Sequence, residues 1–282
     1  MITRRHAIFL TITMAMISTA MTACEGQDTT TQPAIVLVAF GTSVPEARRT
    51  FDYIDAAARV RYPDHDIRWA FTSEFIRKKL AKQGIHTMSL DDVIATLRTE
   101  GIDSAVFQSL HIAPGQEYRE ISAVDTTGMT IAVGDALLTS DQDIADTISA
   151  IEPHINSEAE VVVVAHGNEH HPELNAQILG FAAAIEAEYT NVSVCSVEGQ
   201  PGSDRLAQVR LRTAEGRPVI FIPLMIVAGD HIINDVMGNE PDSWRVRVNA
   251  PDAACTPSLG YNDAILDIYF RHIDHAMDQL TD

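Results

Sequence analysis

The chain has 282 residues, of which 46% are hydrophobic and 21% charged, a composition typical of a folded globular protein and not of a disordered or collagen-like chain. Its 39 acidic residues outnumber the 20 lysines and arginines, and the formal net charge of −19 argues against a nucleic-acid partner. The three cysteines, Cys24, Cys195 and Cys255, form no CxxC pair, which argues against a disulfide framework and a structural zinc site.

Residues 1–23 have the features of a signal peptide. Two arginines precede an apolar run at residues 7–20, which is short for a membrane span. We therefore expect an exported, periplasmic protein. The segment MTAC, which ends at Cys24, resembles a bacterial lipobox, so a lipid anchor at Cys24 and simple cleavage nearby both stay open. Residues 24–33 are polar and predict a flexible tether.

From residue 34 onward, short β-branched runs alternate with longer amphipathic stretches, as in βαβ units with parallel strands. The predicted strands lie at residues 35–40, 67–71, 105–111, 130–133, 161–166, 192–197, 219–227 and 245–249. Corresponding strands are similarly spaced, which predicts an α/β fold of two similar halves, each a four-stranded parallel sheet flanked by helices, with the active-site cleft between them. We divide these halves into an N-terminal domain at 34–150 and a C-terminal domain at 151–263.

Capping residues and amphipathic stretches indicate the helices. They are predicted at residues 43–60, 73–83, 89–100, 141–151, 172–189, 203–215 and 264–280. Ser43 followed by Glu46 has the spacing of a capping box, and Ser89 is expected to cap the third helix. The last helix, 264–280, is expected to pack back on the N-terminal domain.

Polar side chains follow several of the predicted strands, where parallel sheets bind ligands. His111 and His166 end strands, His231 follows the seventh, Glu198 follows the sixth, and Glu117 lies in a predicted loop after His111. A single histidine at such a place is more often a hydrogen-bonding loop residue. Because imidazole and carboxylate together suit late first-row divalent metals, the set predicts a metal site with open positions.

Other motifs in the chain argue against rival activities. Residues 166–171 contain the letters H-x-x-E-H of a protease motif, but that motif needs a helix, and Gly167 directly after a strand favours a turn. The glycine-rich patterns that hold nucleotide phosphates are missing, so no nucleotide is expected. Gly41, Thr42 and Ser43 form a small-residue turn that either receives an anionic group or is only a tight turn before a helix.

Six segments carry a resemblance to a known family: VAFGTS at 38–43, AFTS at 70–73, QSLHI at 108–112, AHG at 165–167, VEG at 197–199 and PLMIVAGDHIIND at 223–235. Together they resemble the anaerobic cobalt chelatases of the CbiK type, which are class II chelatases. The resemblance implies ATP-independent insertion of Co(II) into sirohydrochlorin or precorrin-2 in cobalamin synthesis, with Fe(II) as a further candidate metal.

The resemblance also implies roles for individual residues. His166 and His231 correspond to the family's active-site histidines, Glu198 to its metal-binding acid, and Glu117 to an assisting acid. The expected substrate contacts lie at five residues, namely Gly41, Thr42, Ser43, Ser73 and His111. We also expect a homo-oligomer. The export segment departs from many family members, so an exported metal- or haem-binding protein without turnover stays open as an alternative.

Overall fold

The computed structural model describes residues 32–214 and 216–281. The predicted signal peptide, the lipobox at Cys24 and nearly all of the tether lie outside these residues, so their predictions stay untested. None of the helices in the described part of the chain combines the length and apolar composition needed to cross a membrane. Residues 32–282 form one compact unit.

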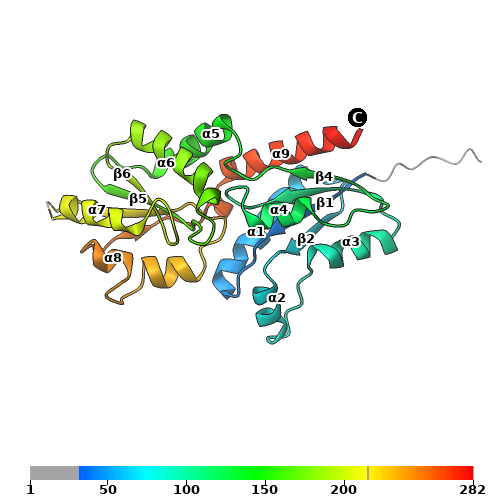
Figure 1. Ribbon diagram of the computed structural model, residues 1–282, viewed down its shortest axis with the longest axis horizontal. Helices are drawn as coiled ribbons and strands as arrows, with labels where there is room; N and C mark the ends of the chain where they lie inside the picture. The colour runs from blue at the N-terminus through cyan, green and yellow to red at the C-terminus, as the bar shows by residue number, and fades with distance from the viewer. Residues whose placement is uncertain (1–31, 215, 282) are drawn as a thin grey trace, which may run out of the picture. The chain divides into compact units, whose positions relative to one another are not determined.

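The first half contains a parallel sheet with the strand order β2-β1-β3-β4 (Figure 1). Its strands are β1 (Ala34–Ala39), β2 (Ile67–Phe71), β3 (Ser104–Ser109) and β4 (Thr130–Gly134). Its helices are α1 (Pro45–Arg61), α2 (Glu74–Ala81), α3 (Leu90–Thr99), α4 (Gln116–Ser122) and α5 (Asp141–Ile151). In the central strand, Leu37 is paired with Trp69 of β2 and Gln108 of β3.

The second half repeats this arrangement with the strand order β6-β5-β7-β8. Its strands are β5 (Glu160–Ala165), β6 (Val192–Ser196), β7 (Val219–Pro223) and β8 (Ala254–Cys255). Its helices are α6 (Ala176–Glu188), α7 (Leu206–Thr213), α8 (Trp244–Arg247) and the π-helix η4 (His231–Val236). Short 3₁₀ turns lie at η1 (Glu152–His154), η2 (Pro172–Asn175), η3 (Ser203–Arg205) and η5 (Leu259–Tyr261). The two flanked, four-stranded parallel sheets confirm the predicted fold class.

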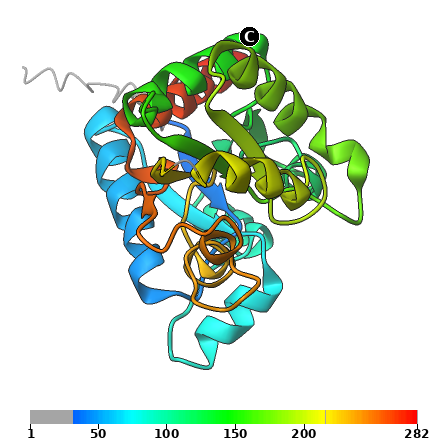
Figure 2. The same cartoon turned by 90° about the vertical axis from the view of Figure 1, so that its left-hand side faces the viewer.

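The central strands β1 and β5 are buried along their whole length, which explains their nearly continuous apolar sequences. The last helix, α9 (Asp263–Thr281), packs against β3 and β4 of the first sheet, although it follows the second half in the chain. Figure 2 shows the segment that leads into α9 beside α1. One apolar core includes residues of both sheets and of α9, such as Leu37, Val163 and Tyr269. The division into domains at 150/151 therefore stays a prediction.

Of the two capping residues predicted, one is confirmed and one is wrong. Ser89 forms a capping box with Asp92, as expected. The capping box predicted at Ser43 is wrong, because the N-cap of α1 is Val44 and no side chain caps it. Instead, the Thr42 hydroxyl accepts a hydrogen bond from the Val44 amide at 3.2 Å, so the turn before the helix uses a neighbouring side chain.

Two predictions of secondary structure, one in each half, are also wrong. The alternating residues 245–249 predict a strand, but residues 244–247 form α8, and the edge strand β8 is only two residues long at 254–255. Trp244 and Val248 are both buried, which is the spacing of one helix face, whereas Val246 is exposed. Glu117 is predicted in a loop but lies in α4, a short helix with one buried residue, Ile121.

Candidate metal centre

Three metal-ligating side chains of the second half come together at the carboxyl ends of its strands. His166 follows β5, Glu198 follows β6, and His231 begins the π-helix η4 after β7. One nitrogen or oxygen donor from each side chain lies within 4.8 Å of the other two. Among the residues that the structure describes, no other group of three His, Cys, Asp or Glu side chains meets this criterion.

The main chain fixes the two loops that carry His166 and Glu198. The Glu198 amide donates a hydrogen bond of 2.8 Å to the His166 carbonyl. Between them, Gly167 has a φ of 76°, and a Cβ there would overlap the carbonyl oxygen of Glu198. A glycine is therefore needed at this position both for its conformation and for the close approach of the two loops.

Hydrogen bonds at one ring nitrogen orient each imidazole. His166 Nδ1 lies 2.9 Å from the Gly167 carbonyl oxygen, and His231 Nδ1 lies 2.6 Å from Asp235 Oδ2. Because a carbonyl or carboxylate oxygen accepts hydrogen bonds, Nδ1 is the donor in both rings and Nε2 keeps its lone pair. The ring centres are 4.9 Å apart with planes at 82°. Each imidazole thus offers Nε2 as a ligand, in the geometry typical of histidines at metal sites.

Asp235 is a functional candidate that the sequence analysis missed. It lies four residues after His231 within η4, so both side chains project from the same side of one helical turn. The spacing His231-x-x-x-Asp235 was the signal that pointed to this pair. It was not used because the sequence analysis placed His231 after a predicted strand at 219–227 and predicted no helix at 231–236, where η4 lies.

The exposure of the cluster leaves it open to a ligand. His166 is exposed, and Glu198 and His231 are partly buried. Two imidazoles and one carboxylate are a donor set for late first-row divalent cations, and three protein ligands leave coordination positions for another molecule. The cluster can therefore bind a cation and present it to a second ligand.

The protease motif at 166–171 is absent as a structural unit, because these residues are not helical. His170 and His171 are exposed on the loop, and neither belongs to the cluster. Cys195 is buried in β6, and burial raises the pKa of its thiol to about 12, which fits the expectation of an inert core residue.

His111 lies apart from this cluster and makes structural contacts. Its Nδ1 is 2.9 Å from Ser109 Oγ, and its Nε2 is shielded from solvent without a hydrogen-bond partner. Burial lowers the pKa of His111 to about 4, so its imidazole is neutral at ordinary pH. The Tyr269 hydroxyl donates to the His111 carbonyl at 3.0 Å, which ties α9 to the end of β3.

The other predicted site residues lie in the first half, outside the cluster. Gly41 adopts a φ of 101° in the turn after β1, and Ser73 Oγ accepts a hydrogen bond from the Ile76 amide as the N-cap of α2. A Cβ placed on Gly229 would lie 3.4 Å from Thr42 Oγ1. The segment two residues before His231 thus contacts the turn at Thr42. The roles of Gly41, Thr42, Ser43, Ser73, His111 and Glu117 in substrate binding or catalysis stay predictions.

Comparison with known families gives the cluster a context. The family model described as cobalt chelatase (CbiK) matches residues 33–278, nearly the whole described part of the chain. The chain belongs to the CbiK family of cobalt chelatases. This membership makes it a chelatase and confirms the family expected from the strand-end segments.

Two curated relatives are similar along most of their length. The chain is 30% identical over 265 residues to the sirohydrochlorin cobaltochelatase CbiKC of Nitratidesulfovibrio vulgaris, covering 89% of this chain and 93% of the relative. It is 31% identical over 261 residues to the sirohydrochlorin cobaltochelatase of Salmonella typhimurium, covering 88% of this chain and 98% of the relative.

Two solved structures share the fold of this chelatase. SirB from Bacillus subtilis, solved with Fe³⁺, superposes with a TM-score of 0.60 at 11% sequence identity, covering 87% of this chain and 96% of SirB. CbiX, described as the terminal enzyme of sirohaem biosynthesis in denitrifying bacteria, gives a TM-score of 0.53 at 17% identity, covering 86% of this chain and 99% of CbiX. At these identities the likeness concerns the fold alone.

Proposed function

We propose that this chelatase inserts Co(II) into sirohydrochlorin, without ATP, at the cluster of His166, Glu198 and His231. The observation that carries the proposal is the convergence of these three donors within 4.8 Å, with Nε2 of both imidazoles free to bind. Both curated relatives are named sirohydrochlorin cobaltochelatases, which supports the choice of metal and macrocycle.

Metal insertion requires a ligand exchange at the metal and a deprotonation of the macrocycle. The metal must lose coordinated water, and the pyrrole N–H groups of the macrocycle must lose their protons. Neutral imidazole is both a good ligand for Co(II) and a base near neutral pH, so His166 and His231 serve delivery of the metal and acceptance of the protons. The Glu198 carboxylate completes the coordination and offsets part of the cation's charge.

The Asp235 carboxylate supports this role of His231. It accepts a hydrogen bond from Nδ1 at 2.6 Å, which fixes the orientation of the ring and leaves Nε2 available to a metal. The corresponding acceptor for His166 Nδ1 is the neutral carbonyl oxygen of Gly167. His231 is therefore the imidazole of the cluster that a charged partner orients.

The net charge of −19 affects the two substrates in opposite ways. An acidic protein attracts a divalent cation and repels the carboxylates of a tetrapyrrole. The chain must therefore provide local positive groups where the macrocycle binds.

The test is anaerobic incubation of the purified protein with Co(II) and sirohydrochlorin, followed by the visible absorption of the macrocycle against a protein-free control. Many turnovers per protein support the proposal. Metallation that stops at one equivalent supports instead an exported protein that binds metal or haem without turnover. Parallel assays with Fe(II) and with precorrin-2 establish the preference for metal and for macrocycle.

Export is the second part of the proposal, and it rests on residues 1–23. We expect the protein in the periplasmic or membrane fraction of cells that express the full chain. The mass of the mature N-terminus distinguishes lipidation of Cys24 from simple cleavage, and an intact N-terminus in the cytoplasm contradicts export. Size-exclusion chromatography with light scattering tests the expected homo-oligomer.

A further inference from the structure

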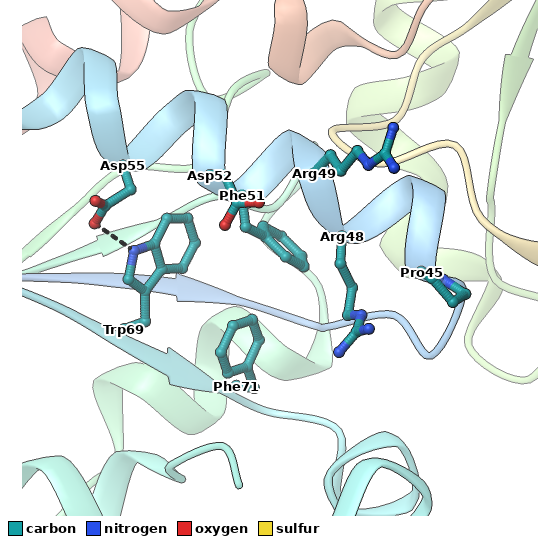
Figure 3. Close-up of a pocket in the computed structure, with 8 residues that line it drawn as sticks. All are labelled: Pro45, Arg48, Arg49, Phe51, Asp52, Asp55, Trp69 and Phe71. Carbon is teal, nitrogen blue, oxygen red and sulfur yellow. Dashed lines mark hydrogen bonds between the residues drawn. The ribbon is translucent and has the colours of Figure 1, made fainter. Parts of the chain in front are cut away.

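A pocket of about 590 Å³ lies on the first half of the molecule, between α1 and β2, and shares no residue with the histidine cluster (Figure 3). Three aromatic side chains and four charged ones make up most of its lining. The lining residues are Pro45, Arg48, Arg49, Phe51, Asp52, Asp55, Trp69 and Phe71. The family model and the comparisons assign no role to this pocket.

The aromatic side chains give the pocket a flat apolar wall. Trp69 and Phe71 of β2 are stacked, with ring centres 5.9 Å apart and planes at 11°. Phe51 of α1 packs edge-on against both rings at 5.3 Å. A wall of this kind contacts planar or apolar groups of a ligand over a large area.

The positive charge of the pocket is unpaired. Within the described residues, neither the Arg48 side chain nor the Arg49 side chain forms an ion pair or a hydrogen bond, and Arg48 Nε is shielded from solvent without a partner. Figure 3 shows Arg48 extending from α1 toward Phe71, whereas the Arg49 side chain extends from the helix in another direction. Arg48 as a whole is only partly buried, but a shielded N–H group without an acceptor is costly, and a carboxylate bound to this guanidinium can supply the missing acceptor.

The two acidic groups in the lining do not neutralise Arg48. Asp55 accepts hydrogen bonds from Arg59 and from Trp69 Nε1, so its charge is already paired. Asp52 is exposed and lies one helical turn beyond Arg48 along α1. The pocket therefore has a cationic end near Pro45 and an acidic end further along the helix.

One turn of the chain, at Thr42, lies next to both the cationic end of the pocket and the segment before His231. Pro45 begins α1 directly after the turn that contains Thr42. Thr42 in turn lies close to Gly229, two residues before His231, because a Cβ placed on Gly229 would be 3.4 Å from Thr42 Oγ1. The turn at Thr42 is therefore next to both the start of α1, which lines the pocket, and the segment that leads into His231.

We propose that this pocket binds a carboxylate-bearing edge of the tetrapyrrole substrate, with the carboxylate on Arg48 and the attached pyrrole ring or side arm against Trp69 and Phe71. This inference rests on the proposed function, since it names the part of the protein that recognises the macrocycle. Arg49, which is exposed, adds a weaker electrostatic attraction for the substrate carboxylates. The acidic protein thereby supplies a local cation for an anionic substrate.

The first test replaces Arg48 by glutamine and measures both substrates separately. We expect Arg48→Gln to raise the KM and the Kd for sirohydrochlorin by roughly 10- to 100-fold, the usual effect of losing a hydrogen bond to a charged group. We expect kcat and the affinity for Co(II) to stay within about 2-fold, because a bound substrate still reaches an intact cluster. Circular dichroism and thermal unfolding confirm that the variant is folded.

Arg61→Gln is the matched control, because it removes the same charge from the same helix. Arg61 pairs with Asp274 of α9 and does not line the pocket. It is expected to leave the KM for sirohydrochlorin near the wild-type value. An equal rise in KM for both variants shows a general effect of net charge and overturns the proposal.

A second arm uses sirohydrochlorin whose carboxylates are converted to methyl esters. If Arg48 binds a substrate carboxylate, the ester binds wild type and Arg48→Gln equally. A small carboxylate such as succinate tests a separate ligand: binding to the pocket without competition against sirohydrochlorin overturns the proposal, and competition supports it.

The outcomes separate this inference from the proposed function. No metallation by the wild type contradicts the proposed function, and binding of metal-free sirohydrochlorin still tests the pocket through the difference between wild type and Arg48→Gln. Metallation by the wild type with unchanged KM and Kd in Arg48→Gln keeps the proposed function and overturns the pocket.

Discussion

The two halves each contain a four-stranded parallel sheet but carry different side chains around it. The second half brings together two imidazoles and a carboxylate, which are donors for a cation. The first half has stacked aromatic rings and unpaired guanidinium groups, which suit an organic anion. Under the two proposals made above, a repeated scaffold separates the recognition of a metal from that of its organic acceptor. Strand-end loops and η4 perform the first task in one half, and α1 and β2 perform the second in the other.

The largest expected effect is the loss of Co(II) insertion when a ligand in the second half is removed. His231→Ala should lower the rate of Co(II) insertion by roughly 100-fold or more, because it removes a ligand and the base with the carboxylate partner. The Kd for metal-free sirohydrochlorin should stay near the wild-type value. Stopped-flow absorption gives the rate, and fluorescence titration gives the Kd.

His170→Ala is the matched control for this variant, since His170 is exposed in the loop after β5 and lies outside the cluster. It should retain the wild-type rate. Undiminished turnover by His231→Ala, or an equal loss in both variants, would falsify the assignment of His231.

An intermediate effect is expected for the partner of His231. Asp235→Asn keeps a hydrogen-bond acceptor but removes its charge, and changes of this kind typically cost about 10- to 100-fold in metal affinity. We expect the Kd for Co(II) to rise by that factor and the visible spectrum of bound Co(II) to shift, with sirohydrochlorin binding unchanged. Asp235→Glu should recover part of the affinity.

Asp230→Asn provides the comparison within the same turn, because Asp230 accepts a hydrogen bond from the Asn234 side chain and does not contact His231. Its effect on Co(II) affinity should be within about 3-fold. A loss as large as that of Asp235→Asn would show that any negative charge near η4 matters, and not the orientation of the ring.

The smallest expected effect is on the thermal stability of the fold and does not involve the histidine cluster or the pocket. Asp143 of α5 accepts hydrogen bonds from Ser140, Arg271 and His272. Burial alone would raise the pKa of its carboxyl, but these hydrogen bonds outweigh it and hold the pKa below its ordinary value. The charged form is therefore favoured in the folded state, and this stabilisation is present above the ordinary pKa and is lost as the pH falls through the folded value.

Asp143→Asn removes this pH dependence. The melting temperature of the wild type should fall more steeply than that of the variant as the pH is lowered from about 5 to 3, by on the order of 2–4 °C. Arg271 also pairs with Asp146, so Asp146→Asn is the control that keeps Asp143. Parallel melting curves for wild type and Asp143→Asn would contradict this assignment. Metallation at neutral pH should be unchanged.

The strands and most helices were predictable because their burial follows a simple pattern. Fully buried parallel strands such as β5 require an uninterrupted apolar run, and Val161 to Val164 provide it. The prediction of a strand at 245–249 was wrong because alternation of Arg and Val over a few residues does not distinguish a strand from one helical turn. The burial of Trp244 and Val248 on one side of the segment stabilises the helix instead.

The candidate site was predictable in its composition but not in its details. His166, Glu198 and His231 stand at the ends of parallel strands, where topology brings loops together. Asp235 and the pocket at Arg48 were not found, because they depend on a π-helix and on which guanidinium lacks a partner. The spacing of His231 and Asp235 was a local signal, but only the helical turn shows that the two side chains meet. The missing partner of Arg48 has no local signal in the sequence.

The position of α9 has a consequence for the order in which the chain folds. The first sheet leaves the ribosome or an export channel before the rest of the protein, yet the face of β3 and β4 is covered by the last helix of the chain. The N-terminal sheet must therefore wait, with an apolar surface open, until residues 263–281 arrive. A chain that stops before α9 leaves this face uncovered and is expected to aggregate.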